Sequence, residues 1–368
     1  MTEQTDHLFS PASLGSLELR NRLVRSATAE QLASEPVGRA TPALASLYGN
    51  LARGGVGLVI TGHAFVSPAG KAHREMLGIH CDEMIPGLKT LADAVHAGGG
   101  AIAVQIQHGG RQSTLDAVPE AIAPSAVPMH SGATPREMTQ AEIVETIDAF
   151  GQAARRAKSA GMDAVQVHAA HGYLISEFLS PHSNHRKDAW GGDFDRRLAF
   201  LGAACEAVRG QVGADYPVFI KLGMMDNVDQ VADGLTPEDG ARIVSRLADF
   251  GLDAVEVSGA YDGPGRFNVR MGVGTKVSEA YFRHLAQRAK ASTHLPVMLV
   301  GGLRSRQVMD DVLASGDADF VSLCRPLIRE PDLPNRLRTG EASVAACISG
   351  GRCWPEELGQ GIACRCAA

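Results

Sequence analysis

Short apolar, β-branched runs alternate with amphipathic helical segments along almost the whole chain, and this alternation constrains the fold more than any other feature. Strands are predicted at residues 23–27, 56–63, 101–107, 164–168, 218–222, 254–258, 297–300 and 320–324. Helices are predicted at residues 84–97, 140–160, 196–212, 237–250, 278–292 and 304–314, among others. Thr139 and Thr236 are suited to cap two of them, and Pro237 to a first helical position. Strands separated by helices pair in parallel, because each helix returns the chain to the same end of the sheet.

A helix–Gly–strand unit recurs in the chain and favours a closed barrel over an open sheet. Residues 161–168 (GMDAVQVH) recur as 251–258 (GLDAVEVS), with a weaker copy at 316–322. The alternative fold, an open doubly wound sheet, normally carries a Gly-rich phosphate loop after its first strand. Residues 26–28 are Ser-Ala-Thr instead. Eight repeated units therefore predict a single α/β domain, a (β/α)8 TIM barrel.

The connections predict where the functional end of this barrel lies. We expect residues 1–345 to form the barrel and residues 346–368 a Cys-rich tail that is not a separate domain. Residues 8–19 carry turn signals and predict an N-terminal hairpin that caps one end. Long loops are predicted after strands three, four and six, at residues 109–138, 172–195 and 259–277. In barrels, loops that follow strands build the active site.

Composition excludes several classes of partner. The net charge of -6 arises from 41 acidic and 35 basic residues that are mixed along the chain, so no basic patch favours nucleic acid or a membrane surface. Residues 1–9 have neither a signal peptide nor a transit peptide pattern. The seven cysteines do not form a disulfide framework. We expect a cytoplasmic protein whose partner is a small-molecule substrate, and the sequence leaves a homo-oligomer open.

Strand alternation points three polar side chains into the barrel near its rim: Gln105, His168 and Lys221. An unpaired buried lysine is costly, so Lys221 needs an anionic partner. One interpretation is an ion pair with Glu256 on the next strand. The other is the electron-rich edge of a ring such as a reduced flavin, with Gln105 pairing to the pyrimidine.

The segment after strand four carries two histidines and a tyrosine: His168, His171 and Tyr173. The histidines converge only if the chain turns directly after His168. They then aim two donors at one oxygen, and Tyr173 offers a proton, because a free tyrosine has a pKa of about 10. A core histidine beside an unrelated loop histidine is the commoner arrangement. A metal site with His182 and His185 is a weaker alternative, since no acidic or Cys ligand has fitting spacing.

The last two strands end in residues that suit a phosphate group. Gly301 and Gly302 follow strand seven, and Arg325 follows strand eight. Glycines let backbone N–H groups approach an anion, and an arginine binds it with two donors. This is the position at which many barrels bind phosphate.

At these residues the sequence resembles the Old Yellow Enzyme family of FMN-dependent oxidoreductases, and in particular the FMN-barrel part of 2,4-dienoyl-CoA reductase-like members. The resemblance spans about residues 8–337. Its most specific motif runs from His168 to Gly192, and further motifs lie at residues 19–24, 105–111 and 325–331.

The resemblance implies an ene-reductase that reduces the activated C=C bond of α,β-unsaturated carbonyl compounds by a ping-pong mechanism. NADH or NADPH reduces the FMN, hydride leaves from flavin N5, Tyr173 protonates the α carbon, and His168 and His171 hold the carbonyl oxygen. The resemblance also implies that FMN is bound by Ser26, Ala27, Thr28, Gln105, Lys221, Gly301, Gly302, Cys324 and Arg325.

Two departures from the family pattern matter. Ala29 stands where many members have a Cys or Thr that tunes the flavin. In the tail, Gly350 stands near a position where cluster-containing members have a Cys ligand, while Cys347, Cys353, Cys364 and Cys366 remain. We therefore expect free thiols rather than an iron–sulfur cluster, and no other metal.

Two alternative functions remain. The first keeps the flavin and oxidises or demethylates amines or betaines, but such pockets tend to replace the Tyr or a His. The second is a flavin-free barrel, an aldolase or isomerase, in which Lys221 would form a Schiff base. The natural substrate and the choice between NADH and NADPH are not encoded in any recognisable motif.

Overall fold

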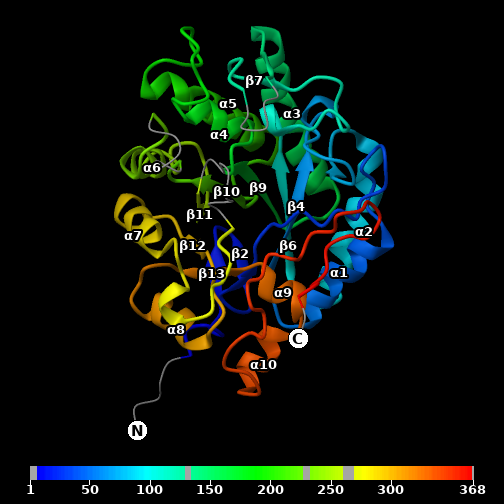
Figure 1. Cartoon of the computed structure of the whole chain (residues 1–368), viewed down its shortest axis with the longest axis vertical. Coiled ribbons are helices and arrows are strands. Elements are labelled where there is room, and N and C mark those ends of the chain that lie inside the picture. Colours follow the sequence, from blue (N-terminus) through cyan, green and yellow to red (C-terminus); the bar gives the residue numbers. More distant parts are fainter. Residues whose placement is uncertain (1–5, 129–133, 227–232, 260–268, 367–368) are drawn as a thin grey trace.

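The computed structural model describes residues 6–128, 134–226, 233–259 and 269–366. Eight parallel strands form a closed barrel in its centre, in the order β3-β13-β12-β11-β10-β9-β6-β4, and β3 also pairs with β4 to close the ring (Figure 1). The predicted barrel is confirmed. Its strands are β3 (Leu23–Arg25), β4 (Leu58–Phe65), β6 (Ala101–Gln107), β9 (Ala164–Ala169), β10 (Val218–Gly223), β11 (Ala254–Ser258), β12 (Val297–Val300) and β13 (Phe320–Leu323).

Helices surround the strands on the outside (Figure 1). They are α1 (Pro42–Arg53), α2 (Ile85–His96), α3 (Gln140–Ser159), α4 (Leu174–Leu179), α5 (Phe194–Val212), α6 (Pro237–Val244), α7 (Arg283–Ser292), α8 (Arg306–Ala314), α9 (Arg325–Arg329) and α10 (Leu333–Thr339). Thr139 and Thr236 cap α3 and α6 as predicted, each within a reciprocal capping box. None of the helices in the described ranges has the length and apolarity to cross a bilayer.

The barrel has two separate hydrophobic layers. The larger one lies between the strands and the surrounding helices. The smaller one fills the N-terminal half of the barrel interior, where Phe219, Met298 and Phe320 pack together. Leu14 and Leu19 of the antiparallel hairpin β1 (Ala12–Leu14) and β2 (Leu17–Leu19) join this inner layer. The predicted hairpin therefore closes the N-terminal end of the barrel.

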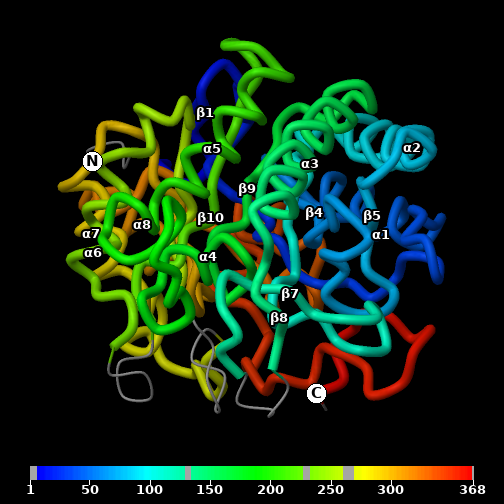
Figure 2. Tube along the Cα trace, turned by 90° about the horizontal axis from the view of Figure 1, so that it is seen from above, coloured from blue at the N-terminus to red at the C-terminus, as the bar shows by residue number. Residues whose placement is uncertain are grey.

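The opposite, C-terminal rim carries the long connections (Figure 2). The one after β6 includes the short strands β7 (Ile122–Ala123) and β8 (Arg136–Glu137), and the one after β9 includes α4. The third long loop was predicted after β11. Residues 260–268 of that loop lie outside the described residues. The remaining rim surrounds a pocket.

Candidate active site

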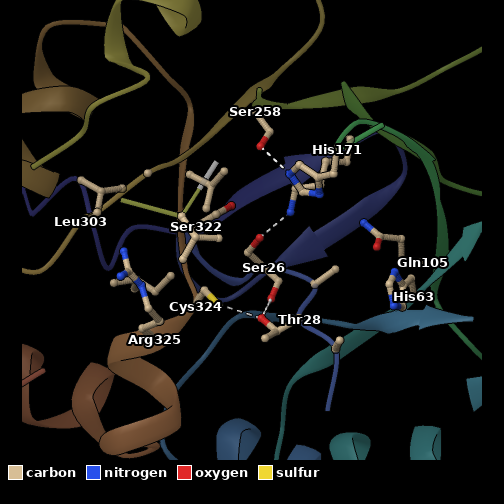
Figure 3. A pocket seen from close by; sticks show the side chains of 18 of the residues that line it. Ser26, Thr28, His63, Gln105, His171, Ser258, Leu303, Ser322, Cys324 and Arg325 are labelled. Atoms are coloured by element: carbon tan, nitrogen blue, oxygen red, sulfur yellow. Dashed lines mark hydrogen bonds between the residues drawn. The ribbon is translucent and has the colours of Figure 1, made fainter. Parts of the chain in front are cut away.

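A pocket of about 350 Å³ opens at the C-terminal mouth of the barrel (Figure 3). Seven of the eight strands supply a lining residue, and β3 contributes through the segment that directly follows it. All twelve residues that the sequence analysis singled out line it together. They are Ser26, Ala27, Thr28, Gln105, His168, His171, Tyr173, Lys221, Gly301, Gly302, Cys324 and Arg325. Residues that the sequence analysis did not single out also line it, among them His63, Ser258, Tyr281, Ser322, Ser349 and Trp354.

Lys221 lies at the floor of this pocket with 2% of its surface exposed. Its Nζ donates a hydrogen bond to the Ser26 hydroxyl at 2.7 Å and lies 3.2 Å from Glu256 Oε2. The ion pair with Glu256 that the sequence left open is therefore present. Lys221 still lines the pocket, so the ion pair does not exclude a ring edge beside it, and that contact stays a prediction.

Two glutamines extend this network across the neighbouring strands. Gln166 Nε2 donates to Glu256 Oε2 at 2.9 Å, and Gln105 Nε2 donates to Gln166 Oε1 at 2.7 Å. All three side chains are buried. Glu256 Oε1 is buried and has no hydrogen-bond partner among the described residues. Gln105 uses one of its two amide N–H donors inside the network, so its carbonyl oxygen and its second N–H have no partner among the described residues.

His168, His171 and Tyr173 come together because the chain turns immediately after β9. His171 and Gly172 both have left-handed backbone conformations, with φ of 64° and 73°. The ring of His168 stands edge-on to those of His171 and Tyr173, with centroids 5.0 Å apart in both cases. The convergence that the sequence made conditional on a turn is thus present in the structure.

Hydrogen bonds fix how His168 presents its ring. The backbone N–H of Ala170 donates to His168 Nδ1 at 3.3 Å, so the proton of the neutral ring sits on Nε2. His171 Nε2 lies 2.9 Å from the hydroxyl of Ser258. Burial, more than the neighbouring charges, lowers the pKa of His168 well below its usual value and that of His171 to about 3. Both imidazoles are therefore neutral at pH 7.

His63 is the pocket residue that strand alternation misses. Leu58 and Ile60 of β4 point into the barrel, so simple alternation turns residue 63 outward. The register between β4 and β6 shifts between Ile60 and His63, and this irregularity brings the imidazole to the pocket. Its ring lies edge-on to Tyr173, with the centroids 5.1 Å apart.

The other end of the pocket suits an anionic group. Gly301 and Gly302 have positive φ values of 137° and 73°, and a Cβ on Gly302 would lie 2.9 Å from the Tyr281 ring. The buried guanidinium of Arg325 has one hydrogen-bond partner among the described residues, the Ser349 carbonyl oxygen at 3.3 Å. Its remaining N–H groups are available to a ligand. The hydroxyl of Ser322 is likewise buried without a partner in the described chain.

The C-terminal tail contributes to the pocket wall. Trp354 lines it and donates an indole N–H to the Ala29 carbonyl oxygen at 3.1 Å. Further along, the Ile362 N–H donates to the Glu30 carbonyl oxygen at 2.8 Å, so the tail covers the loop after β3. None of its four cysteines is in a disulfide, nor is any of the other three. Within the described ranges, no group of three or more His, Cys, Asp or Glu side chains is arranged to hold a metal.

FMN fits this arrangement of donors. Lys221 and the Gln105 carbonyl oxygen face one end of the pocket, where a pyrimidine edge needs both a cation and an acceptor. Arg325 and the Ser322 hydroxyl stand at the other end, where a phosphate needs donors. The Ser322 hydroxyl, buried without a partner in the described chain, lines the pocket where such a ligand would supply one.

Residues 7–343 match the NADH:flavin oxidoreductase / NADH oxidase family. The chain is 39% identical to an NADPH dehydrogenase of Geobacillus thermodenitrificans, over 89% of this chain and 92% of that protein. It is 36% identical to an NADH oxidase of Thermoanaerobacter brockii, over 93% of this chain and 52% of that protein. The chain thus spans about half the length of the first curated relatives it matches.

The fold also matches solved structures of the same kind. An Old Yellow Enzyme homologue from Zymomonas mobilis is 26% identical, with a TM-score of 0.78 over 92% of this chain and 94% of that one. The family match, rather than the shared barrel fold, contradicts the flavin-free aldolase or isomerase alternative. The chain belongs to the NADH:flavin oxidoreductase / NADH oxidase family, the Old Yellow Enzyme type of oxidoreductase, whose members use FMN with NADH or NADPH.

Proposed function

We propose that this chain is an FMN-dependent ene-reductase that reduces the C=C bond of α,β-unsaturated carbonyl compounds with electrons from NADH or NADPH. One observation carries the proposal. Two neutral imidazoles and a phenol meet at one point of the pocket, above a floor that contains a buried lysine. This is the set of groups that a conjugated carbonyl needs at its oxygen and at its α carbon.

We assign the cofactor contacts as follows. Lys221 and Gln105 hold the pyrimidine edge of the FMN, and Ser26, Ala27 and Thr28 line the ring beside them. Arg325, with Gly301, Gly302 and Cys324, holds the phosphate. The Lys221–Glu256 pair gives the lysine a fixed position before the ring binds, which limits the reorganisation that binding requires.

The protein's own groups then organise the reaction. When bound, FMN supplies the hydride. His168 donates Nε2–H to the substrate oxygen, and His171 donates beside it from a ring that Ser258 orients. Because neither imidazole is charged, they stabilise negative charge on the oxygen by hydrogen bonds rather than by transferring a full proton. Tyr173 gives its phenolic proton to the α carbon.

The experiment follows the colour of the purified protein. Absorbance near 450 nm should bleach anaerobically when NADH or NADPH is added, and should return when 2-cyclohexen-1-one is added without oxygen. Saturated ketone should appear in an amount equal to the flavin. If only oxygen restores the colour and no member of an enone panel does, the ene-reductase proposal is wrong, although the family assignment would stand.

A paired substitution examines the oxygen site separately. Replacing both His168 and His171 with Ala should weaken the binding of phenols, which imitate the enolate oxygen, by at least tenfold for two lost hydrogen bonds of about 1 kcal/mol each. The charge-transfer absorbance of phenol with the flavin measures this affinity. Unchanged affinity would remove both histidines from the oxygen site.

A further inference from the structure

Three imidazoles line the pocket, and each has one ring nitrogen bonded to the protein. His168 Nδ1 accepts from Ala170, His171 Nε2 bonds Ser258, and His63 Nε2 lies 3.0 Å from His73 Nε2. The second nitrogen of each ring has no partner among the described residues. What each ring offers to a ligand therefore depends on where its proton sits.

The tautomer of His63 is set by a chain of two hydrogen bonds, which runs through His73 to the backbone carbonyl of Arg74. His73 Nδ1 lies 2.6 Å from the carbonyl oxygen of Arg74, which can only accept, so His73 carries its proton on Nδ1. Burial lowers the pKa of both His63 and His73, which keeps both rings neutral at pH 7. His73 Nε2 is then a lone pair, and His63 Nε2 must carry the proton that is shared between them.

The Nδ1 of His63 is consequently an acceptor, whereas the Nε2 of His168 is a donor. The two ring centroids are 6.2 Å apart. The oxygen and the nitrogen of a carboxamide each make a hydrogen bond of about 2.9 Å, and the two bonds point away from each other. The rings of His63 and His168, with their centroids this far apart, can therefore bind both atoms of one carboxamide. An enone presents only an oxygen and has no N–H for His63.

We propose that His63 accepts a hydrogen bond from the carboxamide N–H of the reduced nicotinamide while His168 and His171 donate to its carbonyl oxygen. His63 thereby favours the reductant over the enone in a pocket that both must use. The inference rests on the proposed function only in that nicotinamide enters this pocket. Binding of nicotinamide is measured without any enone, so the two proposals fail separately.

The test is a double-mutant-type cycle that combines a substitution of His63 with removal of the amide nitrogen from the coenzyme. NADH and reduced 3-acetylpyridine adenine dinucleotide both have a carbonyl group attached to the dihydropyridine ring, but the second has a methyl group in place of the amide nitrogen. Stopped-flow reduction of the FMN enzyme at increasing concentration gives a dissociation constant for each. His63→Ala should raise the constant for NADH about fivefold and that for the acetylpyridine analogue less than twofold. NADPH and its analogue replace this pair if the protein prefers them.

Two further variants keep the result interpretable. His63→Asn retains a short acceptor and should recover part of the preference for NADH. His73→Leu removes the partner that fixes the tautomer, and the preference should fall about twofold although His73 does not line the pocket. FMN content and flavin absorbance show whether each variant folds around its cofactor.

Two outcomes would overturn the inference. If His63→Ala weakens both dinucleotides equally, the ring only shapes the pocket. If it leaves both dissociation constants unchanged and slows reoxidation of the flavin by enone, His63 acts on Tyr173 instead. In either case the preference for the amide would have to arise elsewhere.

Discussion

The two halves of the barrel interior are built from the same strands and have opposite chemistry. The N-terminal half is apolar and is closed by the hairpin, while the C-terminal half is polar and open. On β10 the change takes two residues, from Phe219 to Lys221 on the same inward face. Phe320 and Ser322 repeat it on β13. Because alternate residues share a face, one strand can contribute both to the apolar layer and to the pocket lining.

This division predicts that function and stability can be damaged independently. The largest effect is expected at Tyr173. Its replacement by Phe removes the proposed proton donor and should slow reoxidation of the flavin by enone by about 10²- to 10⁴-fold. Reduction by NADH or NADPH and the thermal midpoint should change little. Stopped-flow measurement of the two half-reactions checks this, and unaltered enone reoxidation would show that water or another acid donates the proton.

In the apolar half, Phe219→Ala should lower the free energy of unfolding by about 3–5 kcal/mol, because it leaves a cavity in a closed layer. FMN content and the rate per bound flavin should survive at low temperature. Urea titration followed by tryptophan fluorescence measures the loss. Phe219→Leu is the matched control and should cost about 1 kcal/mol. A large drop in rate per flavin would show that the two halves are coupled.

In the polar half, Lys221→Met should abolish stable FMN binding and also destabilise the apoprotein by about 2–3 kcal/mol, since Glu256 is left buried without its cation. Adding Glu256→Gln should restore most of the stability but not the FMN binding. Gel filtration with flavin absorbance and urea titration separate the two effects. Recovery of FMN binding in the double variant would contradict the role proposed for the lysine.

The smallest expected effect is a loss of folding stability at acidic pH. Burial lowers the pKa of His108 to about 4, and a histidine in the unfolded chain titrates near 6.5. Between these values the unfolded state binds the proton and the folded state does not, so this contribution is complete above about pH 6.5 and is lost as the pH falls. From pH 7 to pH 5 the loss is about 2 kcal/mol. His108→Asn keeps an acceptor for the Gly110 N–H and should reduce the loss of stability by that amount in urea titrations at the two pH values.

Periodicity predicted the barrel and three inward-facing pocket residues, because a strand's pleat determines which side chains face inward. Turn signals predicted the hairpin, and the family resemblance added the residues after β3. Periodicity failed where the pleat is interrupted, as at His63, where the register with β6 shifts. It also extended α6 to residue 250, although the helix ends at Val244 and a run of turns follows. Helix α1 was not singled out, although Thr41 caps it and Pro42 begins it.

Contacts between distant parts of the chain could not be predicted. Trp354 reaches the pocket by bonding to Ala29, 325 residues earlier. The Glu256 ion pair and the flavin site were treated as alternatives, since a sequence does not reveal that one amine can serve both. The roles of the twelve site residues remain predictions. Their meeting in one pocket makes the substitutions above decisive.

The hairpin beneath the inner layer has a kinetic consequence. Leu14 and Leu19 close the N-terminal end, so within the described residues the pocket opens at the C-terminal mouth. If the hydride donor and the enone share this pocket, as proposed, they must bind in turn, and excess enone should fill the pocket before the coenzyme binds. Velocity is expected to pass through a maximum and decline as enone concentration rises, with the maximum shifting upward as more coenzyme is supplied.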